Sequence, residues 1–241
     1  FDFAANQNNK RSLLILAIFN INGLYVKKNP QKGLEYLIRC SKCGSEISTD
    51  ANFLVGYFYH VGLYVEQDME KAIHYYKEAS SFNYALAKNN LGIIYRNGFD
   101  NEIKKELGWA MQYFEEAIKY NDHCFQLYNL AHLYFYEKPI ENSNQESIKL
   151  LIKSLKYDHY SSKILLCIVS ITEFGNDINK IIKELSKFEN FSEKLAILIC
   201  DIIRYYKLDQ PSILKEKYDQ YRHINYIFDF DFFADILSMV Y

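Results

Sequence analysis

Apolar residues recur every three or four positions along most of this chain, which is the spacing of the buried side of an α-helix. Stretches that alternate apolar and polar residues, as half-buried strands do, find little support. The three prolines all lie near expected helix boundaries, so the helices are expected to run without interruption. The pattern predicts helices over residues 12–23, 30–43, 51–62, 69–81, 85–97, 106–120, 124–136, 144–157, 160–173, 178–188, 193–207, 211–222 and 226–240.

Residues suited to helix N-termini precede several of these segments. Asn-Pro at residues 29–30 fits an N-cap followed by a first-turn proline, and Asp68 is expected to cap the helix over 69–81. Ser-Asn-Gln-Glu at residues 143–146 has the spacing of a capping box. Gln-Pro at residues 210–211 is expected to open a further helix.

One pattern of residues occurs twice in the middle of the chain. The first copy has Ala51, Gly56, Tyr59, Gly62, Val65, Asp68, Ala72, Tyr75, Tyr76 and Ala79. The second copy has Ala87, Gly92, Tyr95, Gly98, Ile103, Glu106, Ala110, Tyr113, Phe114 and Ala117. A fixed period of about 36 residues is typical of a solenoid of helix pairs, in which each unit packs on its neighbours.

These residues resemble the Sel-like repeat, a relative of the tetratricopeptide repeat. The match is nearly complete over residues 51–83 and holds over 84–121 with two extra residues in the loop; it weakens in the flanking repeats. The resemblance implies an all-α, right-handed superhelical solenoid of antiparallel helix pairs. We expect a repeat array over residues 1–157, and degenerate helical repeats with a C-terminal cap over residues 158–241. The first residues fit the end of an earlier repeat, so the chain is expected to be a fragment of a longer array.

The glycines of the repeat are expected to let helices approach closely. Glycine costs about 1 kcal/mol relative to alanine inside a helix, so Gly56 and Gly92 should be kept for their missing side chains. Gly62 and Gly98 are expected to act in the same way, with Ala72, Ala79, Ala110 and Ala117 as the small surface opposite. The rings of Tyr59 and Tyr95 are expected to fill the space between neighbouring units.

Composition narrows the function further. The net charge of −2 gives no electrostatic footprint for nucleic acid. No apolar run approaches the roughly 20 residues that a membrane helix needs. The five cysteines form no disulfide framework, and we expect reduced thiols in a cytoplasmic protein.

The motif search favours a protein without catalysis. Cys40 and Cys43 form one CxxC pair, whereas a structural zinc site commonly needs two, so a packed helix end is favoured over zinc or redox chemistry. The six histidines form no HxxH or HExxH motif, and no phosphate-binding glycine loop or nucleophile elbow is present. We therefore expect no catalytic residue, no metal and no cofactor.

The best binding candidates are the residues of the first helices that the core pattern does not use. In tetratricopeptide-like arrays these helices line the concave side, where a protein or peptide partner docks. The candidates are Phe53, Tyr57, His60, Asn89, Ile93, Arg96, Tyr128, His132 and Phe135. The alternative is that these rings only cover neighbouring helices. The aromatic, acidic stretch over residues 224–237 is a second candidate, either as a terminal cap or as a docking or dimerisation surface.

The resemblance implies a non-enzymatic protein–protein interaction scaffold or adaptor. A different hypothesis is that the segment is the regulatory or substrate-recruiting part of a larger enzyme, such as a protein kinase whose catalytic domain lies outside it. A third is self-association through the open ends of the solenoid.

Overall fold

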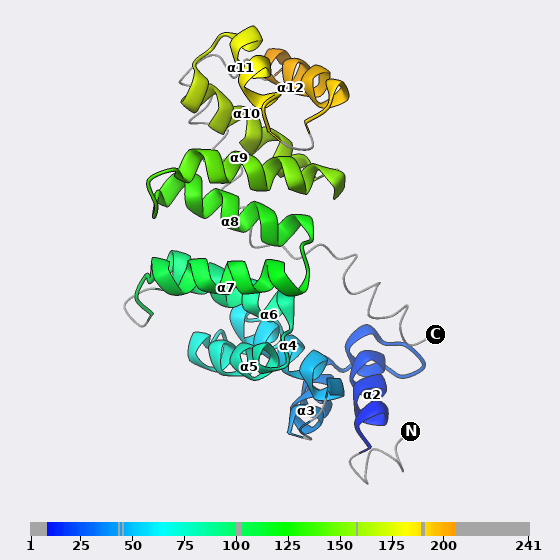
Figure 1. The fold of residues 1–241 in the computed structure, drawn as a ribbon. Helices are drawn as coiled ribbons and strands as arrows, with labels where there is room; N and C mark the ends of the chain where they lie inside the picture. The colour runs from blue at the N-terminus through cyan, green and yellow to red at the C-terminus, as the bar shows by residue number, and fades with distance from the viewer. Residues whose placement is uncertain are drawn as a thin grey trace. The chain divides into compact units, whose positions relative to one another are not determined.

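The computed structural model describes residues 9–42, 44, 46–99, 103–157, 159–188 and 191–205. Within these ranges the regular elements are helices, apart from one isolated antiparallel bridge between Phe99 and Ile103 (Figure 1). The expected helices over 211–222 and 226–240, the boundary at 210–211 and the aromatic stretch over 224–237 lie outside the described residues. The contacts divide the chain into two compact units, residues 1–121 and 122–241.

The first unit is a series of three antiparallel helix hairpins. They are α2 (Lys10–Asn22) with α3 (Pro30–Ser41), α4 (Glu46–Val61) with α5 (Met69–Ser81), and α6 (Ala85–Asn97) with α7 (Leu107–Tyr120). The second helix of each hairpin packs against the first helix of the next, and α4 also contacts α2 directly (Figure 1). The predicted bounds agree closely, except that α4 begins at Glu46 instead of residue 51.

Two of the predicted N-caps are confirmed. The side-chain oxygen of Asn29 accepts a hydrogen bond from the Lys32 amide at 3.1 Å, and that of Asp68 accepts one from the Lys71 amide at 2.9 Å. The predicted capping box at Ser143 is wrong, because Ser143 is already the first residue of its helix. Its hydroxyl bonds backward to the Ile140 carbonyl oxygen at 2.6 Å.

The turn inside each hairpin is closed in a repeated way. The amides of Asn29, Asp68 and Glu106 donate to the carbonyl oxygens of Asn20, Tyr59 and Tyr95, at 2.7, 3.0 and 2.7 Å. The prediction that Gly62 and Gly98 lie inside helices is wrong. Gly62 directly follows α4 and Gly98 caps α6, with φ of 72° and 68°, a left-handed conformation that residues with a Cβ rarely adopt.

The second unit begins with one more hairpin, α8 (Cys124–Glu137) and α9 (Ser143–Ser154), followed by the short 3-10 helix η1 (Leu155–Tyr157). Then come α10 (Tyr160–Phe174), α11 (Ile178–Leu185) and α12 (Glu193–Tyr205). Helix α10 contacts α8, α9, α11 and α12, so it forms the centre of this unit. Leu166, Cys167 and Val169 of α10 are fully buried in its core.

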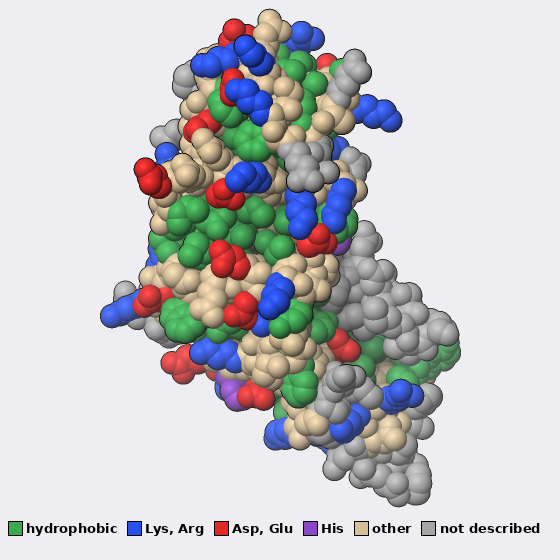
Figure 2. Space-filling model, viewed as in Figure 1, with side chains coloured by type: hydrophobic (Ala, Val, Ile, Leu, Met, Phe, Trp, Pro, Cys, Tyr) green, Lys and Arg blue, Asp and Glu red, His purple; other side chains and the backbone are tan. Residues whose placement is uncertain are grey.

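None of the helices in the described part of the chain is long and apolar enough to cross a membrane. On the face shown in Figure 2, basic and acidic side chains are intermixed among the apolar ones.

Candidate binding surfaces

The glycine positions of the repeat face aromatic rings. A Cβ added to Gly56 would lie 2.8 Å from Cδ1 of Tyr76 and 3.2 Å from the Ala72 carbonyl oxygen. A Cβ added to Gly92 would lie 2.6 Å from Cε1 of Phe114, and the three nearest atoms all belong to that ring. Both glycines therefore let the second helix approach, as predicted, but the tightest neighbour is a ring and not a second backbone.

The structure buries most of the nine candidates on the first helices. The buried candidates are Phe53, Asn89, Ile93, Arg96, Tyr128, His132 and Phe135. Tyr57 and His60 of α4 are partly exposed. The six candidates on α4 and α6 belong to the first unit, and the three on α8 belong to the second unit.

His60 and Arg96 occupy the same position of two successive repeats, four residues after the glycine. Nδ1 of His60 lies 3.3 Å from the Tyr76 hydroxyl, and the two rings meet edge to face. The guanidinium of Arg96 lies over the Phe114 ring, 6.0 Å from its centroid, and Nε donates to the Asn97 side chain at 3.1 Å. His60 thus covers the Tyr76 ring that packs on Gly56, and Arg96 covers the Phe114 ring that packs on Gly92.

Burial makes His60 an unusual histidine. It lowers the pKa of His60 to about 4, so the ring is neutral at physiological pH. A neutral imidazole can accept a hydrogen bond from the Tyr76 hydroxyl. Burial also raises the pKa of Tyr76, which keeps that hydroxyl protonated.

Phe53 belongs to the packing between two hairpins. Its ring lies 5.8 Å from that of Tyr76 and 5.2 Å from that of Tyr84, which precedes α6. Tyr84 makes a side-chain hydrogen bond with Asp50, and burial is the main cause that raises the pKa of both groups. With an exposed fraction of 1%, Phe53 is a core residue in this structure.

The two tyrosines of each repeat stack within a hairpin. Tyr59 lies on Tyr75 with centroids 6.0 Å apart and planes 5° apart, and Tyr95 lies on Tyr113 at 5.7 Å and 4°. The prediction that Tyr59 and Tyr95 fill the space between units is therefore wrong. Both pairs join the first helix to the second helix of the same hairpin and are only partly buried.

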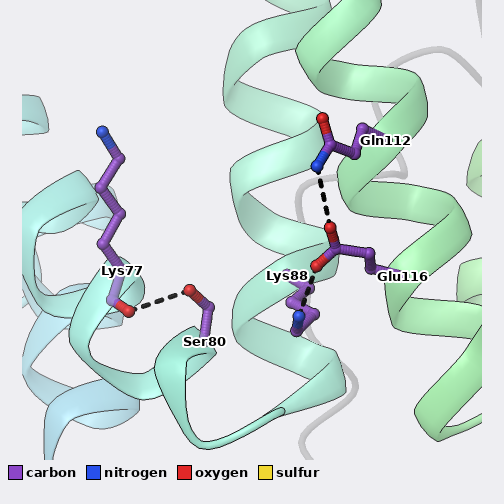
Figure 3. Close-up of polar contacts among 5 residues, drawn as sticks. All are labelled: Lys77, Ser80, Lys88, Gln112 and Glu116. Carbon is purple, nitrogen blue, oxygen red and sulfur yellow. Dashed lines mark hydrogen bonds and ion pairs between the residues drawn. The ribbon is translucent and has the colours of Figure 1, made fainter.

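An ion pair that the sequence analysis did not identify links α6 to α7. Lys88, whose side chain is 8% exposed, pairs with Glu116, and Gln112 donates to the other oxygen of that carboxylate at 3.0 Å (Figure 3). Lys88 is the main cause that lowers the pKa of Glu116. Lys77 of α5 takes no part in this pair, and its carbonyl oxygen accepts from the Ser80 hydroxyl at 2.9 Å (Figure 3).

A second group of polar and aromatic residues lies where α8 begins and η1 ends. Asp122 accepts hydrogen bonds from Tyr157 at 2.9 Å and Lys156 at 3.0 Å, contacts that lower its pKa to about 2. His123 lies 4.6 Å from the Tyr157 ring. Burial, with a smaller effect of His123, lowers the pKa of His159 to about 4. The group ties α8 to the residues between α9 and α10.

The described cysteines are thiols and not halves of disulfides. Cys40, Cys124 and Cys167 are buried, and Cys200 is partly exposed. Burial is the main cause that raises the pKa of Cys167, which keeps it protonated. Cys43 lies outside the described residues. No group of three or more His, Cys, Asp or Glu side chains within the described ranges could hold a metal ion.

Antiparallel helix hairpins that repeat with small residues against rings define an α-helical repeat protein of the solenoid class. The family profile of the Sel1 repeat matches residues 11–45, 49–81, 85–120 and 127–156. The chain therefore belongs to the Sel1 repeat family, and the predicted resemblance and fold class are confirmed.

Solved structures agree with this assignment. A Sel1 repeat protein from Oxalobacter formigenes is 19% identical, with a TM-score of 0.63 over 87% of this chain and 86% of that one. The protective antigen c5321 of uropathogenic Escherichia coli, which displays an SLR fold, is 17% identical, with a TM-score of 0.66. That match covers 86% of this chain but 43% of the antigen. A search of the curated proteins found no match.

Two features of the structure had no counterpart in the sequence analysis. The Lys88–Glu116 pair joins residues 28 positions apart, and only the alignment of α6 with α7 shows that they meet. Trp109 lies beside Tyr113, one of the stacked tyrosines of the third hairpin, and has an exposed fraction of 53%. The repeat alignment contains a signal for Trp109, because its counterpart in the second hairpin is Lys71.

Proposed function

We propose that this chain is a non-enzymatic scaffold or adaptor that binds a protein or peptide on the side formed by its first helices. The observation that carries the proposal is the repeat itself. Successive hairpins present equivalent positions, such as His60 and Arg96, on neighbouring repeats. Such arrays offer extended surfaces on which a partner can contact several repeats at once.

The burial of the candidates assigns them different roles in this proposal. Tyr57 and His60 are the partly exposed members, so they are the ones that make direct contact. Phe53, Asn89, Ile93 and Arg96 lie beneath the surface and hold its shape. Tyr128, His132 and Phe135 of α8 belong to the second unit and are buried there, with the rings of Tyr128 and His132 6.0 Å apart, so they support the packing of that unit.

We further propose that the protein works in a reducing compartment, the cytoplasm. Cys40, Cys124 and Cys167 are buried thiols outside any disulfide, the usual state of cysteine in a reducing compartment.

A peptide selection tests the proposed surface. A random peptide library is selected on the folded chain, and the enriched peptides are measured against Tyr57→Ala and His60→Ala. We expect at least one of these substitutions to weaken binding by about tenfold, the effect of removing a modest hot spot. The matched control is Lys77→Ala, which changes an exposed residue of α5 and should leave binding unchanged. Peptides that are insensitive to both substitutions, or that depend on Lys77, would show that the first-helix side is not the docking surface.

A further inference from the structure

The second and third hairpins of the first unit each contain a pair of stacked tyrosines, but the residues around the two pairs differ. In the second hairpin the Lys71 ammonium lies over the Tyr59 ring, 5.1 Å from its centroid. The same ammonium pairs with Asp68 at 2.8 Å. An acid, a cation and two stacked rings therefore form one closed group at the edge of this hairpin.

The third hairpin keeps the acid and the rings but not the cation. Glu106 stands at the position of Asp68, and Tyr95 and Tyr113 stack as Tyr59 and Tyr75 do. The position of Lys71 is taken by Trp109, whose ring centroid lies 6.3 Å from that of Tyr113. The cations of this hairpin that lie over rings do so elsewhere: Lys88 and Lys119 over Tyr120, and Arg96 over Phe114. Within the described residues, the stacked pair of the third hairpin has no cation over it.

We propose that the edge of the third hairpin binds a lysine or arginine side chain of a protein partner. We call Tyr95, Trp109 and Tyr113 the ring platform. The cation would lie over the platform where Lys71 lies over Tyr59, and it would pair with the Glu106 carboxylate as Lys71 pairs with Asp68.

Three properties of the platform favour this occupant. The faces of tyrosine and tryptophan rings carry negative potential and attract a cation, and tryptophan is the strongest of them. Trp109 is 53% exposed and Glu106 is exposed, so both can reach a partner. The second hairpin shows within the same molecule that a stacked tyrosine pair with an acid at this position holds an alkylammonium group.

The platform is separate from the first-helix residues of the proposed function, because it shares no residue with that set. Packing also does not explain why tryptophan replaces lysine at this position. Ala72 and Ala110, which follow Lys71 and Trp109, are both fully buried, so the hairpins pack alike beside the exchanged residue.

Trp109 is the only tryptophan of the chain, so its fluorescence reports on the platform alone. The probe is an acetylated and amidated peptide of alternating glycine and arginine, titrated into the full chain. The control peptide carries citrulline, which keeps the shape of arginine without its charge. We expect a saturable change in emission with the arginine peptide and about tenfold weaker binding of the citrulline peptide.

Substitutions that keep Trp109 then locate the site. Tyr95→Leu should weaken binding by roughly tenfold, and Tyr95→Phe, which keeps the ring, should bind as the parent does. Glu106→Gln should weaken binding by about threefold, as expected for an exposed charge pair. Tyr59→Leu is the matched control in the second hairpin and should change nothing.

Three results would overturn the proposal. They are a response to the citrulline peptide equal to that of the arginine peptide, no saturable response to either, or equal binding by the parent, Tyr95→Leu and Glu106→Gln. Circular dichroism of each variant shows whether it is folded, and Glu106→Gln together with the citrulline peptide keeps the test decisive if Tyr95→Leu does not fold.

Discussion

In the hairpin α4–α5 the residue before the first buried alanine of the second helix is Lys71, and in α6–α7 it is Trp109. Around this exchange the two hairpins repeat each other closely. Each places a glycine against a buried ring, stacks two tyrosines and closes its turn through a tyrosine carbonyl oxygen. These three contacts between the two helices are kept, whereas the residue at this solvent edge differs.

Three further differences separate the two hairpins, and two of them involve buried residues. Asn52 of α4 is replaced by Lys88 in α6, which brings in the pair with Glu116. His60 is replaced by Arg96, which changes a group that titrates into one that stays charged. The turn of the third hairpin is two residues longer and contains the bridge between Phe99 and Ile103.

The largest effects should come from the shared glycines. Gly92→Leu would push a side chain into the Phe114 ring, and Gly56→Leu into the Tyr76 ring and the Ala72 carbonyl oxygen. We expect each to lower the free energy of unfolding by roughly 1–3 kcal/mol, measured by urea denaturation. Gly108→Leu is the control, because nothing lies within 4 Å of a Cβ there.

A second substitution distinguishes the contacts made at Gly92 from those made at Gly56. Double-mutant cycles measure the relief. Phe114→Ala removes all three of the closest atoms, so Gly92→Leu should cost less in that background than in the parent. Tyr76→Ala leaves the Ala72 carbonyl oxygen in place, so the cost of Gly56→Leu should fall less. Equal relief at both positions, or no loss in either single variant, would contradict the packing described here.

Acid should affect the second hairpin more than the third. The pKa of His60 is lowered to about 4 in the fold, whereas an unfolded histidine has a pKa near 6.5. The unfolded chain therefore binds a proton first as pH falls, and stability decreases between about pH 6.5 and pH 4. We expect His60 to account for about 2 kcal/mol of this loss.

Urea denaturation at pH 7 and at pH 4.5 measures the effect. The variant His60→Gln should lose less stability between these values than the parent. His159 of the second unit, whose pKa is also about 4, remains in both proteins and cancels in the difference. The same loss in parent and variant would show that His60 takes up its proton equally well in the fold.

The Lys88–Glu116 pair should make the third hairpin more sensitive than the second to loss of the acid on its second helix. Glu116→Gln leaves a mostly buried ammonium without its charge partner and should cost about 1–2 kcal/mol. The equivalent change in the second hairpin, Glu78→Gln, alters an exposed residue and should cost less than about 0.5 kcal/mol. Lys88→Met keeps the buried stem without the charge and should be nearly neutral; thermal unfolding of the three variants ranks them.

A smaller difference is expected at the N-caps. Asp68→Ala removes a hydrogen bond to the Lys71 amide and should destabilise by about 1 kcal/mol. Glu106→Ala should have almost no effect, because the Glu106 side chain makes no hydrogen bond with the start of α7. Equal losses in chemical denaturation would mean that both acids act as caps.

The sequence analysis predicted the helices and the packed glycines of the repeat, and missed details that a fixed period does not define. Gly56 and Gly92 were identified because a fixed period placed them against the second helix. The period does not say which neighbour a ring meets, so the stacking of Tyr59 on Tyr75 within one hairpin was not predicted. Gly62 was placed inside a helix because spacing alone cannot show a left-handed backbone.

The candidate surface was harder to predict for a related reason. Helical spacing identified Phe53 and Arg96 as residues outside the core pattern, but the buried rings of Tyr76 and Phe114 give them packing partners. Exposure depends on these contacts between helices, which a one-dimensional pattern does not contain. Trp109 was overlooked because it replaces a single lysine within an otherwise regular repeat.

The central claim is that the repeat separates a shared packing frame from solvent-edge positions free to serve binding. The substitution Trp109→Lys gives the third hairpin the residue that the second hairpin has at this position. The most direct test is the free energy of unfolding of this variant, measured by circular dichroism in urea. A change of less than about 0.5 kcal/mol is predicted, because the substitution restores the lysine, acid and ring group at an exposed position. A loss above about 2 kcal/mol would show that Trp109 is part of the packing and would contradict the account.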